Sequence, residues 1–134
     1  MVAGIEIKLY QGLCSSENMF TQEVGGCIVT VIYVETLPVK PQGILTHYPP
    51  FFLQENINKL HSLRSQIVDV PLYQSAKIFY KRKDPALESI KSSIDQLFPK
   101  IQIEEINYRG FNEYVTLMPS LKCFESWQNG KNYF

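Results

Sequence analysis

The stretch that decides the fold reads TQEVGGC at residues 21–27 and continues as IVTVIYV at residues 28–34. The second part is β-branched at almost every position and apolar on both faces, which predicts a central strand covered on both sides. Its expected partner is GILTHYPP at residues 43–50, a short apolar strand that carries His47 before two prolines force the chain out of the sheet. If these strands pair, the thiol of Cys27 and the imidazole of His47 could meet at the rim of a sheet.

The connection between the two strands sets their register. Residues 35–42 contain Pro38 and Pro41, so we expect a turn or a connecting loop there. A turn at residues 36–38 would place Cys27 directly opposite His47. A longer loop, or a bulge at Gly43, would shift the match by a few residues, so both arrangements stay open.

Length and composition describe a globular protein. The chain has 134 residues, of which 45% are hydrophobic and 13% aromatic, enough to form one domain over residues 1–134 with its own core. Thirteen basic residues balance thirteen acidic ones, so no overall field favours nucleic acid or an anionic membrane as a partner. The basic run at residues 81–83 is interpreted as a solvated turn before a helix, in preference to a phosphate or nucleic-acid site.

The sequence contains neither the pattern of a membrane-spanning helix nor that of a signal peptide. The longest apolar run, residues 27–34, is far shorter than the roughly 20 residues that cross a bilayer as a helix. Residues 1–11 alternate instead of forming the basic and then apolar pattern of a signal peptide. We therefore expect a soluble protein of the cytoplasm.

The three cysteines give no framework for a disulfide core or a metal centre. Cys14, Cys27 and Cys123 cannot all pair within one chain, and they lack the CxxC or His-rich spacing of a structural zinc site. Nucleotide-binding and zinc-protease motifs are also missing from the sequence. We expect no metal and no cofactor, and the oligomeric state stays open.

The order of predicted elements gives the fold class. Hydrophobic periodicity and breaking residues predict strands first, then helix, strand, helix, strand, strand. The predicted segments are strands at 4–11, 19–24, 28–34 and 43–48, a loop at 12–18, a helix at 51–66, a strand at 75–80, a helix starting at Asp84-Pro85 and ending before Pro99, a strand at 101–106, a strand or bent pair at 113–124 and a fraying tail at 127–134. This order predicts an α+β fold, a layered α/β sandwich with a mixed, largely antiparallel sheet of five to seven strands and two main helices.

The sequence around Cys27 meets two requirements of a catalytic thiol. Such a thiol needs an exposed position, a base and donors for the developing oxyanion. Gly25 and Gly26 could let a carbonyl group approach the backbone N–H groups. His47 is the candidate base, and it needs a third group to fix its tautomer. The alternative is that Cys27 is a small core residue and His47 a residue at a strand end, because unrelated Cys/His pairs are common.

The spacing of these residues resembles a known family. Thr21, the small residues Gly25 and Gly26 before Cys27, and an apolar run that ends on His47 resemble the CheD family of chemoreceptor glutamine deamidases. The pattern is also similar to their fold relatives, the cytotoxic necrotizing factor catalytic domain and the protein N-terminal asparagine amidohydrolases. The similarity covers about residues 4–110, including the order of helices and strands after the histidine.

The resemblance implies roles for the residues that carry it. Cys27 would be the nucleophile, His47 the general base and acid, and Thr21 the residue that orients the imidazole. The implied activity is a cofactor-independent thiol amidohydrolase that acts on a protein side chain. The family's glycine-rich segment after the first helix is replaced here by residues 74–77. A catalytically inactive module that binds a regulatory protein, or a structural subunit of a larger assembly, therefore stays open as an alternative.

Overall fold

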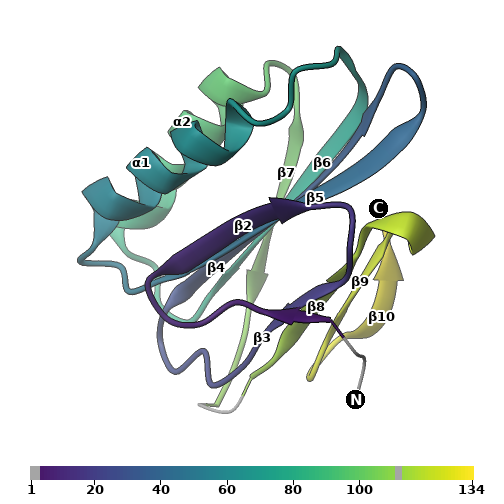
Figure 1. The fold of residues 1–134 in the computed structure, drawn as a ribbon. Helices are drawn as coiled ribbons and strands as arrows, with labels where there is room; N and C mark the ends of the chain where they lie inside the picture. Colours follow the sequence, from purple (N-terminus) through teal and green to yellow (C-terminus); the bar gives the residue numbers. More distant parts are fainter. Residues whose placement is uncertain (1–3, 111–112) are drawn as a thin grey trace.

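A computed structural model of the protein describes residues 4–110 and 113–134, and it has three layers (Figure 1). A central sheet with strand order β2-β5-β4-β6-β7 lies between a pair of helices and a second sheet with order β1-β3-β8-β9-β10. We call them the central sheet and the second sheet. The predicted α+β class with two main helices is confirmed, and the strands are divided between two five-stranded sheets.

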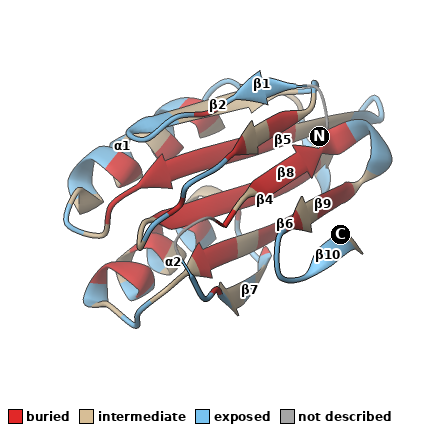
Figure 2. Cartoon of the chain, turned by 90° about the horizontal axis from the view of Figure 1, so that it is seen from below, coloured by how far each residue is buried: buried red, intermediate tan, exposed pale blue. Residues whose placement is uncertain are grey.

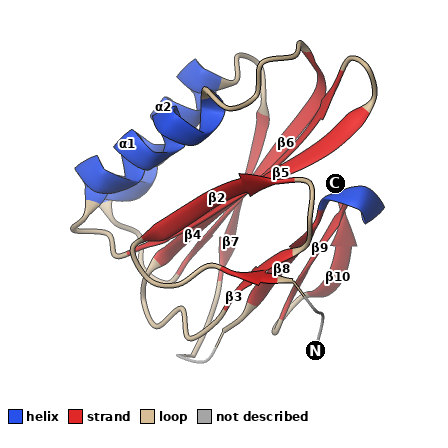
Figure 3. Ribbon diagram, in the orientation of Figure 1, coloured by secondary structure: helices blue, strands red, loops and turns tan. Residues whose placement is uncertain are grey.

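Strands from both halves of the described chain contribute to the second sheet. The central sheet contains β2 (Gln11–Ser15), β4 (Ile28–Thr36), β5 (Lys40–Tyr48), β6 (Pro71–Tyr80) and β7 (Gln102–Asn107). The second sheet contains β1 (Ile5–Glu6), β3 (Met19–Thr21), β8 (Val115–Met118), β9 (Cys123–Ser126) and β10 (Gly130–Tyr133). The helices are α1 (Leu53–Arg64) and α2 (Pro85–Leu97), and the short 3-10 helix η1 (Pro119–Leu121) lies between β8 and β9. Figure 3 shows α1 and α2 together on the face of the central sheet that points away from the second sheet.

The middle strand β4 separates two cores. It is buried at every position except Glu35, as expected for a strand covered on both faces (Figure 2). Residues such as Ile28 and Ile32 pack toward the helices, while Val29 and Val31 pack toward the second sheet. Because successive side chains of a strand point to opposite faces, position along β4 decides which core a residue joins.

The observed register of β4 and β5 does not place Cys27 directly opposite His47. Val29, and not Cys27, lies opposite His47. The β4–β5 ladder continues to Thr36 opposite Lys40, so the connecting loop comprises residues 37–39. The residue opposite His47 is therefore two positions later in the sequence than Cys27. Since side chains alternate with a period of two, a shift of two keeps Cys27 on the face of the sheet that carries His47.

Two segments that were expected to be irregular form strands. Part of the predicted loop at residues 12–18 belongs to β2, which pairs with the edge of β5 and partly buries Leu13 against the second sheet. The predicted fraying tail at residues 127–134 contains β10, which pairs with β9, and Phe134 stacks on Tyr33 with ring centroids 5.2 Å apart. In both cases pairing with a distant strand outweighs a polar, turn-rich local sequence.

The predicted helices form close to their expected limits. Asp84 caps α2, accepting a 2.8 Å hydrogen bond from the Ala86 N–H, and Pro85 occupies the first turn. The strand predicted at residues 4–11 is shorter, because only the two residues of β1 pair with β3. No helix within the described ranges is long and apolar enough to cross a membrane.

Candidate active site

A tight turn carries Cys27 to the start of β4. The Cys27 N–H donates a 2.9 Å hydrogen bond to the Val24 carbonyl and closes the turn. Between them, Gly25 and Gly26 have φ of 53° and 100°, the left-handed region that costs little only for glycine. A Cβ at Gly26 would meet no atom within 4 Å, so backbone conformation, and not crowding, favours glycine at this position.

His47 is held at the boundary between the two sheets. Its Nδ1 lies 2.6 Å from the Oγ1 of Thr21, and both side chains are buried. Its other ring nitrogen, Nε2, is buried and makes no hydrogen bond of good geometry with any described residue, although the Val24 carbonyl lies near the ring. An unpaired buried polar group costs about 1–3 kcal/mol, which makes Nε2 a candidate for a function.

Burial favours the neutral forms of both the imidazole and the thiol. It lowers the pKa of His47, an effect that the nearby Val24 carbonyl partly opposes by favouring the protonated ring. It also raises the pKa of the half-buried Cys27 thiol. The resting site therefore pairs a neutral thiol with a neutral imidazole. When the ring proton is on Nδ1, it is donated to Thr21 and Nε2 is left as an acceptor.

Thr21, Cys27 and His47 lie at the core between the two sheets, but the thiol makes no hydrogen bond to the imidazole. Thr21 and His47 are in direct contact, and Cys27 packs partly into the same core between the sheets. Cys27 immediately precedes β4, two positions before Val29, the residue that lies opposite His47. The thiol makes no hydrogen bond to the ring. Catalytic hydrogen bonds are often long in unliganded proteins and tighten when substrate binds.

Tyr108 holds the glycine turn, and sequence reasoning missed it. Its buried hydroxyl accepts a 2.8 Å hydrogen bond from the Gly26 N–H and donates a 2.7 Å hydrogen bond to the Cys27 carbonyl. Burial is the largest cause of the raised pKa of Tyr108. Tyr108 follows β7, 82 residues after Gly26, so no local spacing could have indicated this contact.

A buried carboxyl group lies behind the same turn. The Glu113 carbonyl accepts a 3.3 Å hydrogen bond from the Val24 N–H. The Glu113 Oε1 accepts a 2.6 Å hydrogen bond from the Trp127 N–H, whereas Oε2 has no partner in the part of the chain that the structure describes. Burial raises the pKa of Glu113, and backbone donors such as the Trp127 N–H oppose this shift. Within residues 4–110 and 113–134, no group of three or more His, Cys, Asp or Glu residues is arranged to hold a metal ion.

Comparisons with known proteins leave the family unassigned. No protein-family model matches the chain, and a search of curated proteins finds no match. The resemblance to the CheD family therefore stays a prediction that depends on Thr21, Gly25, Gly26, Cys27 and His47.

Proposed function

We propose that the protein is a cofactor-independent thiol amidohydrolase that deamidates a glutamine or asparagine side chain of a protein substrate. Cys27 is the nucleophile, His47 the general base and acid, and Thr21 the residue that orients the imidazole. We place the reaction in the cytoplasm and expect neither nucleic acid nor membrane lipid as a partner, because the basic and acidic residues balance.

The buried ring of His47 is the observation that carries this proposal. One ring nitrogen is bonded to Thr21, and the other has no hydrogen-bond partner among the described residues. The thiol of Cys27 is on the same face of the central sheet and only partly buried. An oriented imidazole on the sheet face that also carries a partly exposed thiol supports nucleophilic catalysis, which needs a base to accept the thiol proton.

The first half of the reaction forms a thioester. The Cys27 thiol gives its proton to Nε2 of His47 while the sulfur attacks the carboxamide carbon. The carbon–nitrogen bond then breaks, and the imidazolium returns its proton to the departing nitrogen, so that ammonia leaves. Thr21 accepts the Nδ1–H throughout and stabilises the imidazolium. Because the resting imidazole is neutral, it is ready to accept this proton at neutral pH.

The second half of the reaction releases the product. A water molecule gives a proton to His47 as its oxygen attacks the thioester carbon. The carbon–sulfur bond breaks, the thiolate recovers a proton from His47, and the product leaves as a carboxylic acid that ionises. The net change is hydrolysis of a carboxamide to a carboxylate and ammonium, with no oxidant or cofactor required.

The glycine turn supplies donors for the developing oxyanion. The Gly25 N–H has no hydrogen-bond partner in the described chain, so it is the first proposed donor. The Gly26 N–H is bonded to Tyr108, and the oxyanion gains this second donor by replacing the tyrosine hydroxyl. Donors fixed by the backbone stabilise such charge without reorganisation during the reaction.

The proposal is tested with a library of synthetic peptides that each contain one glutamine or asparagine. Ammonia release and incorporation of heavy oxygen from labelled water into the carboxylate report deamidation. We expect wild-type protein to deamidate a subset of the peptides, and Cys27→Ala to lower the rate at least a thousandfold. Hydroxylamine should trap the thioester as a hydroxamate in the wild type only.

Cys14→Ala is the matched control, because Cys14 is a free, half-buried thiol in β2 on the other face of the central sheet. It should keep wild-type activity. Deamidation that persists in Cys27→Ala would sink the assignment of the nucleophile. A wild-type protein that releases no ammonia from any peptide would overturn the amidohydrolase proposal.

A second candidate is a protein-binding or regulatory module of the same fold without activity. The specific observation in its favour is that the Gly26 and Cys27 N–H groups are both engaged and the thiol is neutral at rest. Alkylation with iodoacetamide distinguishes the two candidates. An active site predicts that Cys27 reacts faster than Cys14 and Cys123 and that His47→Ala removes this advantage, whereas a module predicts slow labelling throughout.

A further inference from the structure

A pocket of about 580 Å³ opens beside the glycine turn. Gly25 and Gly26 form one wall, Pro50 and Phe51 at the start of the α1 connection form another, and the loop between β6 and α2 forms a third. We call it the side pocket. The open space next to Gly26 means that a group bound there would touch the segment that carries Cys27.

Phe51 gives the side pocket an unusually exposed apolar wall. It is 81% exposed, although its ring lies tilted against that of Phe52 with ring centroids 5.0 Å apart. Together with Pro50 it forms an apolar part of the lining of this pocket. Exposed aromatic groups that line a pocket are typical of ligand and partner sites.

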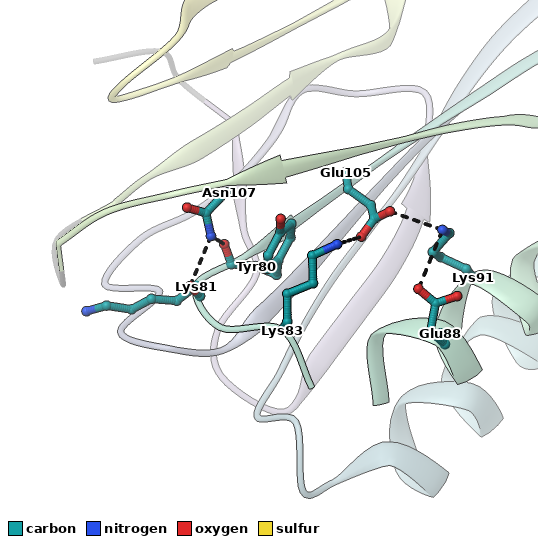
Figure 4. A network of polar contacts seen from close by, with 7 residues as sticks. All are labelled: Tyr80, Lys81, Lys83, Glu88, Lys91, Glu105 and Asn107. Carbon is teal, nitrogen blue, oxygen red and sulfur yellow. Dashed lines mark hydrogen bonds and ion pairs between the residues drawn. The ribbon is translucent and has the colours of Figure 1, made fainter. Parts of the chain in front are cut away.

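The loop between β6 and α2 is held in a fixed position. The Asn107 side-chain amide donates to the carbonyls of Tyr80 and Lys81 at 3.3 and 3.0 Å. Lys83 pairs with Glu105 at 3.5 Å, and Glu105 also pairs with Lys91 at 3.0 Å (Figure 4). Lys83 is therefore neutralised outside the side pocket.

The remaining charged groups leave the side pocket with one uncompensated positive charge. The Lys81 ammonium donates to the Gly110 carbonyl at 3.2 Å, and in Figure 4 its side chain extends away from the Glu105 network. The Asp84 carboxylate accepts from the Ala86 N–H at the start of α2. Arg82 is exposed and makes no ion pair or hydrogen bond with the described residues. Two basic groups and one acidic group line the site.

We infer that the side pocket binds an acidic side chain of the substrate, close in sequence to the residue whose carboxamide is hydrolysed. Arg82 pairs with the acidic side chain, because a guanidinium binds a carboxylate through two parallel hydrogen bonds. Phe51 packs against an apolar part of the same segment. Only the identity of the ligand as a substrate rests on the proposed function.

The volume of the side pocket is large enough to hold part of a peptide segment. Its volume lies within the range of about 300–1,000 Å³ that is typical of ligand pockets, and it is open at the mouth where Arg82 and Phe51 lie. An extended segment with its glutamine or asparagine at the turn would pass along this wall. The substrate class is therefore a carboxamide flanked by Asp or Glu.

The inference is tested with fluorescent peptides that bind to the full chain carrying Cys27→Ala, so that no peptide is consumed. The peptides share a central glutamine and an apolar neighbour and differ only in flanking Glu, Gln or Lys. We expect the Glu peptides to bind about five- to tenfold more tightly than the Lys peptides at low salt, with a smaller difference at high salt. Fluorescence anisotropy measures each dissociation constant.

Arg82→Glu and Lys40→Glu, each combined with Cys27→Ala, form a matched pair with the same change in net charge. Lys40 is exposed at the far end of the β4–β5 hairpin. Arg82→Glu should abolish or reverse the preference for Glu, and Lys40→Glu should keep it. Equal binding of Glu and Lys peptides, no binding of any peptide, or an unchanged preference in Arg82→Glu would overturn the inference.

Deamidation by the wild-type protein separates this inference from the proposed function. Deamidation without a preference for acidic neighbours contradicts the side-pocket assignment and leaves the thiol mechanism intact. A clear preference for Glu in binding, with no ammonia released by the wild type, contradicts the hydrolase and supports an acidic peptide as the ligand of a binding module.

Discussion

Thr21 Oγ1 and His47 Nδ1 lie 2.6 Å apart and join β3 of the second sheet to β5 of the central sheet. The contact is buried, so water does not compete for it. It fixes the plane of the imidazole and leaves Nε2 as the ring nitrogen that has no hydrogen-bond partner within residues 4–110 and 113–134. In the proposed reaction the two sheets therefore contribute different parts of one site.

We expect Thr21→Val to lower the rate of deamidation about 10- to 100-fold with little change in KM. Valine keeps the shape of threonine but leaves Nδ1 unpaired, which also costs about 1–2 kcal/mol of stability. Thr21→Ser keeps the hydroxyl and should restore most of the rate. Nitrogen NMR of the His47 ring checks the tautomer directly, since a residue with only a packing role would leave that signal unchanged.

Tyr108→Phe should loosen the turn without opening a cavity. It removes the acceptor for the Gly26 N–H and the donor to the Cys27 carbonyl, so we expect a loss of about 1–3 kcal/mol in the free energy of unfolding. Hydrogen exchange at the Gly26 amide should speed up, and deamidation should slow about tenfold. Wild-type exchange at Gly26 in this variant would show that the hydroxyl does not hold the turn.

The stability of the protein should decrease as the pH falls below about 6.5. Burial lowers the pKa of His47 from its ordinary value of 6.5, so between the two values the unfolded chain binds a proton that the folded chain does not. The stabilisation is complete above pH 6.5 and is lost as the pH falls toward the folded pKa. Denaturant unfolding of His47→Gln should show a flatter dependence in this range, and the exposed His61 provides the control variant His61→Gln. Equal slopes in the wild type and His47→Gln would contradict the expectation.

Gly43→Ala should destabilise the packing of the two sheets. A Cβ at this position would lie 2.5 Å from Cδ2 of Leu117 and 3.0 Å from Cγ of Pro119. Such overpacking costs about 1–3 kcal/mol. A double-mutant cycle with Leu117→Ala measures the effect: the cost of Gly43→Ala should be smaller in the Leu117→Ala background, and strictly additive costs would show that the sheets do not meet at Gly43.

The sequence predicts those parts of the fold whose signals are local. The apolar residues 28–34 predict β4, and Asp84 followed by Pro85 predicts the start of α2. Edge strands such as β2 and β10 carry polar, turn-rich sequences and form because a neighbouring strand offers free hydrogen-bonding groups. The two-residue shift between β4 and β5 depends on the conformation of residues 37–39, which strand composition does not determine.

The residues of the candidate site also divide into those that the sequence predicts and those that only the structure shows. Thr21, Cys27 and His47 could be selected because a resemblance covers all three, and the structure adds the contact between Thr21 and His47. Tyr108 and Glu113 reach the turn through tertiary packing alone. Residues of this kind become visible only when segments far apart in the sequence are placed side by side.

The pairing of β3 with β8 sets Thr21 opposite Val115, and this has a consequence for biosynthesis. A nascent chain that has emerged through His47 already carries the sulfur and the imidazole but lacks the strand that holds β3 beside them. In the proposed reaction, the site is therefore complete only after residues 115–118 have been translated and have paired with β3.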